Sequence, residues 1–228
     1  MLHSNTLGHP AIHARRKRRL SRKALGAALG LCMVVAALGT WLATRAHTVD
    51  LGNEQQLSDS GLLQDWAKGA VIVMIRHAER CDSAPGPCLD DPTGITVAGS
   101  EAAVQVGLGL HHLGLANADV LSSPKLRTRQ TAHFILGQPV ATEDWLESCD
   151  NQFAQQAMAR KQPGHNLVLV THNGCIDHFQ RQQRVVGGER QSGYASALFV
   201  SVDGNGKARI LGRLNAPDWQ RVLASAGQ

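Results

Sequence analysis

A histidine stands among arginines where an apolar run of the sequence ends. The run is VIVMI, residues 71–75, and Arg76, His77 and Arg80 follow it with no turn residue between them. Guanidinium groups are planar forks of donors that match phosphate oxygens, often two at a time. An unprotonated imidazole can attack phosphorus and hold it covalently, and neighbouring cations keep the ring unprotonated. The stretch therefore predicts phosphoryl-transfer chemistry, with His77 as the nucleophile and the arginines binding phosphate.

Two more stretches place similar side chains after apolar runs. Arg127 falls in the first turn of the helix expected after residues 118–123, and His172 directly follows the apolar run at residues 166–171. Ligands of a parallel sheet bind beyond the carboxyl ends of its strands, so we expect both residues to converge on His77. Taken singly, His172 also fits a buried structural histidine, and Arg127 also fits a surface charge.

A proton donor for the leaving oxygen is sought in ATEDWLESCD, residues 141–150, because an alkyl phosphate needs one. Its acidic residues are Glu143, Asp144, Glu147 and Asp150. Glu147 is the choice, since it stands between Trp145 and Cys149, where partial burial would raise its pKa. Asp150 is the second choice.

Elements that would position these residues alternate along the chain. Strands are expected at residues 70–75, 118–123, 138–142 and 166–172, with helices at 96–113, 125–136, 152–161 and about 175–184. Two alternating runs around Asp-Gly-Asn-Gly, within residues 195–214, indicate a hairpin. The pattern predicts an α/β three-layer sandwich: a mostly parallel sheet with helices on both faces and one antiparallel edge pair.

The positive charge of the chain belongs to its N-terminal part. The net charge is +5, yet 8 of the 23 Lys and Arg and none of the 18 Asp and Glu precede Asp50, which leaves 15 against 18 from there on. A balance of −3 without a basic patch argues against nucleic-acid binding.

Residues 24–43 contain no charged side chain. Twenty helical residues span roughly 30 Å, the thickness of a bilayer core. We therefore expect a basic cytoplasmic tail at 1–23, a transmembrane signal-anchor at 24–43, a linker at 44–68 and an exported domain at 69–228. A cleaved signal peptide is the alternative, although its apolar region usually runs about 7–15 residues.

Four cysteines lie in the expected exported domain, at Cys81, Cys88, Cys149 and Cys175, while Cys32 lies in the apolar segment. An oxidising compartment favours two disulfides, with three possible connectivities. All four flank the expected site, which favours the local pairs Cys81–Cys88 and Cys149–Cys175. A zinc site is the alternative, but the six residues between Cys81 and Cys88 do not match the usual close spacing of zinc ligands. No metal or other cofactor is expected.

Four motifs in order resemble the histidine phosphatase superfamily, the phosphoglycerate mutase-like group. They are RHAER (76–80), GITVAGSEAA (94–103), SSPKLRTRQTA (122–132) and VTHNG (170–174), and the resemblance covers Val71 to Gly212. It implies that His77 is the nucleophile, that His172 acts with it on the phosphoryl group, and that Arg76, Arg80 and Arg127 form the phosphate pocket. Ala78 and Asn173 stand where the group usually has glycine.

A narrower resemblance is to the Ais-type lipopolysaccharide core heptose(II)-phosphate phosphatases of Gram-negative bacteria. It rests on RHAERCD, CL, TGIT and THN together with a downstream cysteine. It implies a periplasmic phosphomonoesterase, anchored to the inner membrane, that dephosphorylates a heptose phosphate of the lipopolysaccharide core. The alternatives are a mutase or a phosphatase of another sugar phosphate or a phosphoprotein, and an inactive phosphate-binding domain of the envelope. The presence of both His77 and His172 argues against the inactive domain.

Overall fold

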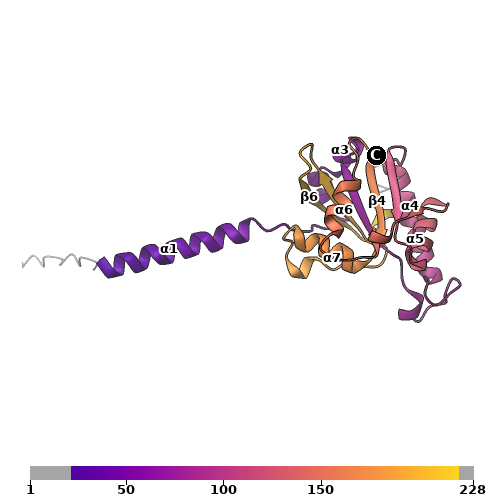
Figure 1. Ribbon diagram of the computed structural model, residues 1–228, viewed down its shortest axis with the longest axis horizontal. Coiled ribbons are helices and arrows are strands. Elements are labelled where there is room, and N and C mark those ends of the chain that lie inside the picture. Colours follow the sequence, from indigo (N-terminus) through magenta and orange to yellow (C-terminus); the bar gives the residue numbers. More distant parts are fainter. Residues whose placement is uncertain (1–21, 221–228) are drawn as a thin grey trace, which may run out of the picture. The chain divides into compact units, whose positions relative to one another are not determined.

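The computed structural model describes residues 22–220 in two compact units, of which one ends at Thr44 and the other begins at Arg45. The first unit contains helix α1 (Arg22–Ala43), drawn in indigo in Figure 1. Among the described residues, no helix combines the length and the apolar character that crossing a membrane requires. The signal-anchor predicted at residues 24–43 falls on α1 and is not confirmed. The tail predicted at 1–23 lies outside the described residues, apart from its last two.

The second unit is built on one sheet of six strands in the order β3-β2-β4-β1-β5-β6. Strands β3, β2, β4 and β1 are parallel, while β5 runs antiparallel to both β1 and β6. The strands are β1 (Val71–Arg76), β2 (Ala118–Ser122), β3 (Ala141–Thr142), β4 (Asn166–Thr171), β5 (Ala197–Val202) and β6 (Ala208–Leu214). The predicted mostly parallel sheet with one antiparallel edge pair is confirmed.

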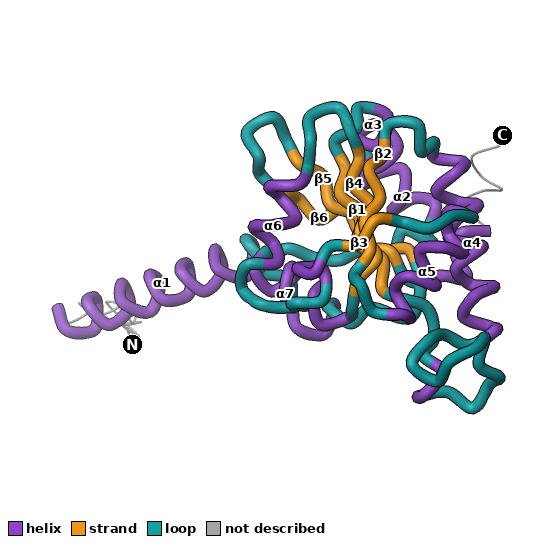
Figure 2. The backbone as a smooth tube through the Cα atoms, turned by 45° about the vertical axis from the view of Figure 1, so that its right-hand side comes forward, coloured by secondary structure: helices purple, strands orange, loops and turns teal. Residues whose placement is uncertain are grey.

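Helices cover both faces of this sheet. Figures 1 and 2 show α4 and α5 on one side of the strands and α6 and α7 on the other. The helices of the second unit are α2 (Glu54–Ser60), α3 (Leu62–Ala67), α4 (Val97–Leu113), α5 (Leu126–Leu136), α6 (Phe153–Arg160) and α7 (Asn173–Gln182). Short 3₁₀ turns occur at Cys81–Ser83, Asp144–Leu146, Gly187–Glu189 and Ala216–Asp218. This is the expected three-layer arrangement.

Strand β1 joins the two halves of the core. Val71, Val73 and Ile75 pack with the buried side chains of α4 and α5, whereas Ile72 and Met74 pack with those of α6 and α7. Successive side chains of a strand point to opposite faces, so a strand buried on both sides must be apolar throughout. Burial on both faces therefore explains why residues 71–75 are all apolar.

The sequence predicts a linker at residues 44–68, but from Arg45 on these residues are part of the folded unit. Leu51, Leu57, Leu62 and Trp66 are buried in the same core cluster as α4 and α5. Trp66 Nε1 donates to the carbonyl of Gly114 at 2.9 Å. Leu62 and Trp66 are four residues apart and therefore lie on one face of α3. The folded unit consequently begins at Arg45 rather than at residue 69.

Observed and expected element boundaries differ by one to three residues, and two of these differences concern the carboxyl edge of the sheet. The third strand is reduced to Ala141–Thr142 at the edge of the sheet, where both residues are exposed. Helix α7 begins at Asn173, two residues earlier than expected, so His172 becomes its N-cap residue with extended backbone angles. The second difference matters for the site, because it places His172 directly between a strand and a helix.

Candidate active site

The residues selected from the sequence line one cavity of about 540 Å³ beyond the carboxyl ends of β1 and β4. The lining is Arg76, His77, Arg80, Lys125, Arg127, Glu147, Ser148, Cys149, His172, Asn173, Gly174 and Tyr194. Register explains the meeting of the histidines: Arg76 pairs with Thr171 across the parallel strands, so His77 and His172 are the next residues on both. Their ring centroids are 5.4 Å apart.

His77 is held with one ring nitrogen free. Its side chain is buried, and Nδ1 lies 2.9 Å from the carbonyl oxygen of Ala78. A carbonyl oxygen can only accept, so Nδ1 carries the proton and Nε2 keeps its lone pair. Burial lowers the pKa of His77 to about 3, with smaller contributions from His172, Arg127 and Arg76. The ring is therefore neutral at physiological pH, the state that a nucleophile needs.

His172 is oriented by two partners. A guanidinium nitrogen of Arg127 lies 3.4 Å from Nδ1 and can only donate, which makes Nδ1 the acceptor. Nε2 of the neutral ring then carries the proton and donates to Ser123 Oγ at 2.9 Å. Burial, followed by the charge of Arg127, lowers the pKa of His172 to about 4.

Arg76 and Arg127 offer donors that no described group accepts. The Nε atom of each is buried and has no hydrogen-bond partner among the described residues. Burial also lowers the pKa of both side chains. Both side chains line the cavity, so their guanidinium groups beside a neutral histidine suit an anionic ligand.

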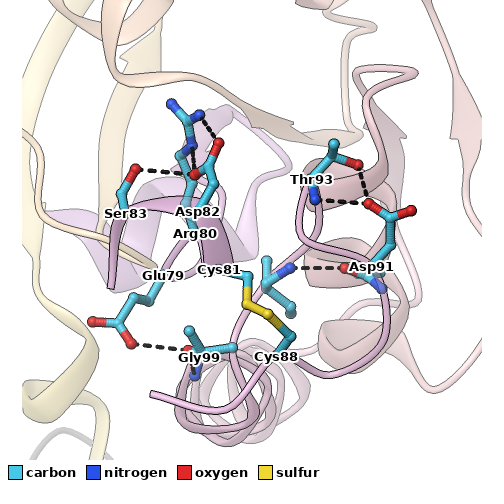
Figure 3. Close-up of a disulfide and its surroundings, with 12 residues drawn as sticks. Glu79, Arg80, Cys81, Asp82, Ser83, Cys88, Asp91, Thr93 and Gly99 are labelled. Atoms are coloured by element: carbon cyan, nitrogen blue, oxygen red, sulfur yellow. Dashed lines mark hydrogen bonds and ion pairs between the residues drawn. A yellow bond between two sulfur atoms is a disulfide. The ribbon is translucent and has the colours of Figure 1, made fainter. Parts of the chain in front are cut away.

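Arg80 lies at the cavity but is already engaged. Its Nε donates to Asp82 Oδ1 at 2.8 Å, and a second guanidinium nitrogen pairs with the other carboxylate oxygen. Figure 3 shows this pair beside the Cys81–Cys88 disulfide. A phosphate group would have to share Arg80 with Asp82. The structure therefore brings Arg80 to the site without leaving its donors as free as those of Arg76.

Both departures from the usual glycines have structural partners. Ala78 is fully buried, and its N–H donates to Thr131 Oγ1 at 2.9 Å. Asn173 Oδ1 accepts from the backbone N–H of Ser192 at 3.2 Å. Neither residue disrupts the geometry around His77 and His172.

Among the four candidate proton donors, Glu147 is the one that lines the described cavity. Its carboxylate lies 3.2 Å from the ammonium of Lys125. The other three are occupied or turned elsewhere: Glu143 pairs with Arg160, Asp144 is exposed, and Asp150 accepts from the backbone of Gln152. Position thus favours Glu147, while its catalytic role stays a prediction.

The structure pairs Cys81 with Cys88 and Cys149 with Cys175, and these are the two local pairs that the cysteine positions favoured. The Cα atoms are 5.2 Å and 4.1 Å apart, respectively. The second bond ties a wall of the cavity to α7, which begins next to His172. In the described part of the chain, no group of three or more His, Cys, Asp or Glu could hold a metal ion.

Sequence reasoning missed Tyr194, Ser123 and Lys125 as parts of the site. The position of Tyr194 follows from the strand order of the sheet and not from a local motif. Ile75 of β1 pairs with Ala197 of the antiparallel strand β5, so the segment entering β5 lies beside the end of β1. Ser123 and Lys125 lie within the motif at residues 122–132, in which Arg127 is the residue that phosphate binding singles out.

Two solved structures of proteins named SixA are similar in fold to this chain. The protein histidine phosphatase SixA, solved with tungstate, aligns with a TM-score of 0.50 at 17% identity, over 65% of this chain and 98% of its own. SixA from Agrobacterium tumefaciens aligns with the same score and identity, over 64% and 97%. At this identity the likeness shows the fold: the chain has the fold of SixA.

Curated relatives point to a narrower group. Proteins named lipopolysaccharide core heptose(II)-phosphate phosphatase, from Escherichia coli O1:K1 and O45:K1, are 36% identical over 117 residues. The match covers 50% of this chain and 58% of each relative, so the chain spans a little over half the length of the relatives it matches. No protein-family model matches the chain.

Proposed function

We propose that the protein is a phosphomonoesterase that works through a phosphohistidine on His77. The observation that carries the proposal is the neutral, buried His77 with Nε2 free, in one cavity with the guanidinium donors of Arg76 and Arg127. Such donors bind and orient a phosphoryl group and stabilise the charge that develops on it.

The proposed reaction has two displacements. Nε2 of His77 attacks phosphorus, the bond to the leaving oxygen breaks, and protonated Glu147 gives that oxygen its proton. Water then attacks the phosphohistidine, the Glu147 carboxylate takes a proton from the water, and the N–P bond breaks. The products are an alcohol and inorganic phosphate, and His77 returns to its neutral form. His172, whose ring centre is 5.4 Å from that of His77, lies beside the phosphoryl group, and Arg76 and Arg127 hold the phosphoryl oxygens through both steps.

A heptose phosphate of the lipopolysaccharide core is the substrate that we propose. The name of the curated relatives supports it. A cavity of about 540 Å³ is also within the range of roughly 300–1,000 Å³ that small-molecule sites occupy, and it exceeds what one phosphate group needs.

We also propose that the phosphatase unit is exported to the periplasm, with the N-terminal segment as inner-membrane anchor or signal. The seven cations at residues 15–23 ahead of the uncharged stretch 24–43 support this orientation. Two disulfides fit an oxidising compartment better than the cytosol. Fractionating cells that express the full chain, with thiol labelling of the periplasmic fraction, tests it. A cytosolic protein with four labelled domain cysteines would contradict the proposal.

The activity is tested by screening the purified full chain against p-nitrophenyl phosphate, heptose phosphate, other sugar phosphates and a phosphoprotein, with and without EDTA. We expect EDTA-insensitive hydrolysis, preferred turnover of heptose phosphate, and an acid-labile, base-stable phosphoenzyme trapped during turnover. His77→Ala should abolish both hydrolysis and the phosphoenzyme.

Two results would contradict different parts of the proposal. Turnover by His77→Ala above about a tenth of the wild-type rate would exclude covalent catalysis at this residue. Hydrolysis of every phosphate except the heptose phosphate would leave the chemistry in place and refute the substrate.

A further inference from the structure

Tyr194 lies against the guanidinium group of Arg76, in a segment that no sequence motif marks. The Cζ atom of Arg76 is 3.8 Å from the centre of the Tyr194 ring. The centre of the same ring is 5.8 Å from the centre of the His77 ring, and Tyr194 forms part of the cavity wall. A cation over an aromatic face is attracted by the ring quadrupole, most strongly where water is excluded. The ring therefore contacts the arginine that directly precedes the proposed nucleophile.

The segment around Tyr194 holds Arg76 from more than one direction. Nη1 of Arg76 donates to the carbonyl of Ser192 at 2.6 Å, and the backbone N–H of Arg76 donates to the carbonyl of Ser196 at 3.0 Å. The ring restrains the guanidinium group from one side, and the bond to Ser192 restrains its Nη1 end. Nε is buried and unpaired among the described residues. The remaining donors of Arg76 are thus oriented before a ligand arrives, which is how preorganised donors lower a barrier.

Contacts to both histidine-bearing loops brace this segment. The N–H of Ser192 donates to Asn173 Oδ1 at 3.2 Å, and the N–H of Ala195 donates to the carbonyl of His77 at 3.3 Å. Ala195 is fully buried and has a φ of 53°, in the left-handed region that residues with a Cβ rarely adopt. Such a conformation persists where surrounding contacts impose it. The backbone at Ala195 therefore sets the position of Tyr194 relative to His77.

We propose that Tyr194 is a positioning residue whose ring, rather than its hydroxyl group, holds the guanidinium group of Arg76 in the orientation that binds the phosphoryl group. The proposal rests on the proposed phosphatase function, since it assigns Arg76 to the phosphoryl oxygens. It accounts for the aromatic side chain at a position where a phosphate site has no direct use for one.

The test compares Tyr194→Leu with Tyr194→Phe in the full chain. Hydrolysis of p-nitrophenyl phosphate measures kcat and KM, and calorimetry measures binding of tungstate, an anion that needs no turnover. Loss of the stack should lower kcat/KM and tungstate affinity by about tenfold in Tyr194→Leu, and Tyr194→Phe should stay within about threefold of wild type. Phe134→Leu is the matched control, because Phe134 is a partly buried aromatic residue outside the cavity.

A double-mutant cycle separates positioning from a general structural role. Lysine cannot stack as a planar guanidinium does, so Tyr194→Leu should cost much less in an Arg76→Lys background than in wild type. Equal costs in the two backgrounds would overturn the proposal, as would a wild-type-like Tyr194→Leu. Equal losses in the Phe and Leu variants would assign the effect to the hydroxyl group instead.

The test remains decisive if Tyr194→Leu does not fold or if the wild-type chain is inactive. If Tyr194→Leu does not fold, Tyr194→Met removes the ring with a flexible side chain and gives the same comparison. A wild-type chain that binds tungstate but hydrolyses nothing would refute the phosphatase function, while its tungstate affinities would still decide the role of Tyr194.

Discussion

Replacing His77 by glutamine should change how the stability of the protein depends on pH. The pKa of His77 is about 3 in the folded protein, chiefly because the ring is buried, against an ordinary value of 6.5. The folded state therefore binds this proton more weakly than the unfolded state does. As the pH falls from about 6.5 to about 3, protonation draws the chain toward the unfolded state, and stability is lost.

The size of the effect follows from the two pKa values. A pH of about 4.5 is about two units below the pKa of His77 in the unfolded state, so the unfolded ring is almost fully protonated. The ring in the folded state is still mostly neutral at that pH. One unit corresponds to 1.36 kcal/mol, so His77 should account for about 2 to 3 kcal/mol of the stability lost between pH 7.5 and pH 4.5.

Urea unfolding at the two pH values, for wild type and His77→Gln, measures this contribution. Every other titrating group contributes to both proteins, so the difference between their losses isolates His77. We expect the variant to lose about 2 to 3 kcal/mol less than wild type on acidification. Equal losses would mean that His77 titrates near its ordinary pKa, and the argument for a permanently neutral nucleophile would be wrong.

Three further predictions concern the other groups at the cavity. Arg127→Lys should lower kcat/KM for p-nitrophenyl phosphate at least about tenfold, because lysine keeps the charge but not the planar fork that binds two oxygens. Glu147→Gln should slow hydrolysis of sugar phosphates by about 10²-fold or more and hydrolysis of p-nitrophenyl phosphate far less, because only the poorer leaving group needs the proton. Replacing Cys149 and Cys175 by serine should lower activity more than the melting temperature, because their disulfide ties the segment carrying Glu147 to the helix after His172.

The Arg127 and Glu147 variants each have a matched control in the chain. Arg129→Lys changes an exposed arginine of the same helix, and Glu143→Gln changes a carboxylate that pairs with Arg160 outside the cavity. Activity that falls as much in a control as in its test variant would remove the assigned role. For the disulfide, a melting temperature that falls sharply while specific activity is retained would make the bond a purely structural one.

The local pattern of apolar residues was sufficient to predict much of the fold. The apolar run at residues 71–75 can be buried only between two layers, and this requirement identifies β1 without any knowledge of its neighbours. The boundary at Arg45 could not be found in the same way. Residues 45–68 look polar along the chain, and their few apolar side chains become core residues only because the sheet lies beside them.

The sequence by itself determined which side chains are candidates for the proposed chemistry. His77, His172 and Arg127 each follow a strand or begin a helix, and the rule that parallel strands end at one edge brings them together. The pairing of Cys81 with Cys88 could also be predicted from the sequence, because the two residues are close in the chain and flank one loop.

The tertiary structure decided how those side chains are held. The Ala78 carbonyl selects the ring nitrogen of His77 that stays free, the pairing with Asp82 restrains Arg80, and the stack on Tyr194 orients Arg76. The meeting of Tyr194 with Arg76 depends on the antiparallel pairing of β5 with β1, which joins segments more than 100 residues apart in the chain. Periodicity and motifs report the local preference of each segment, but a contact between distant segments exists only once the sheet has its strand order and register.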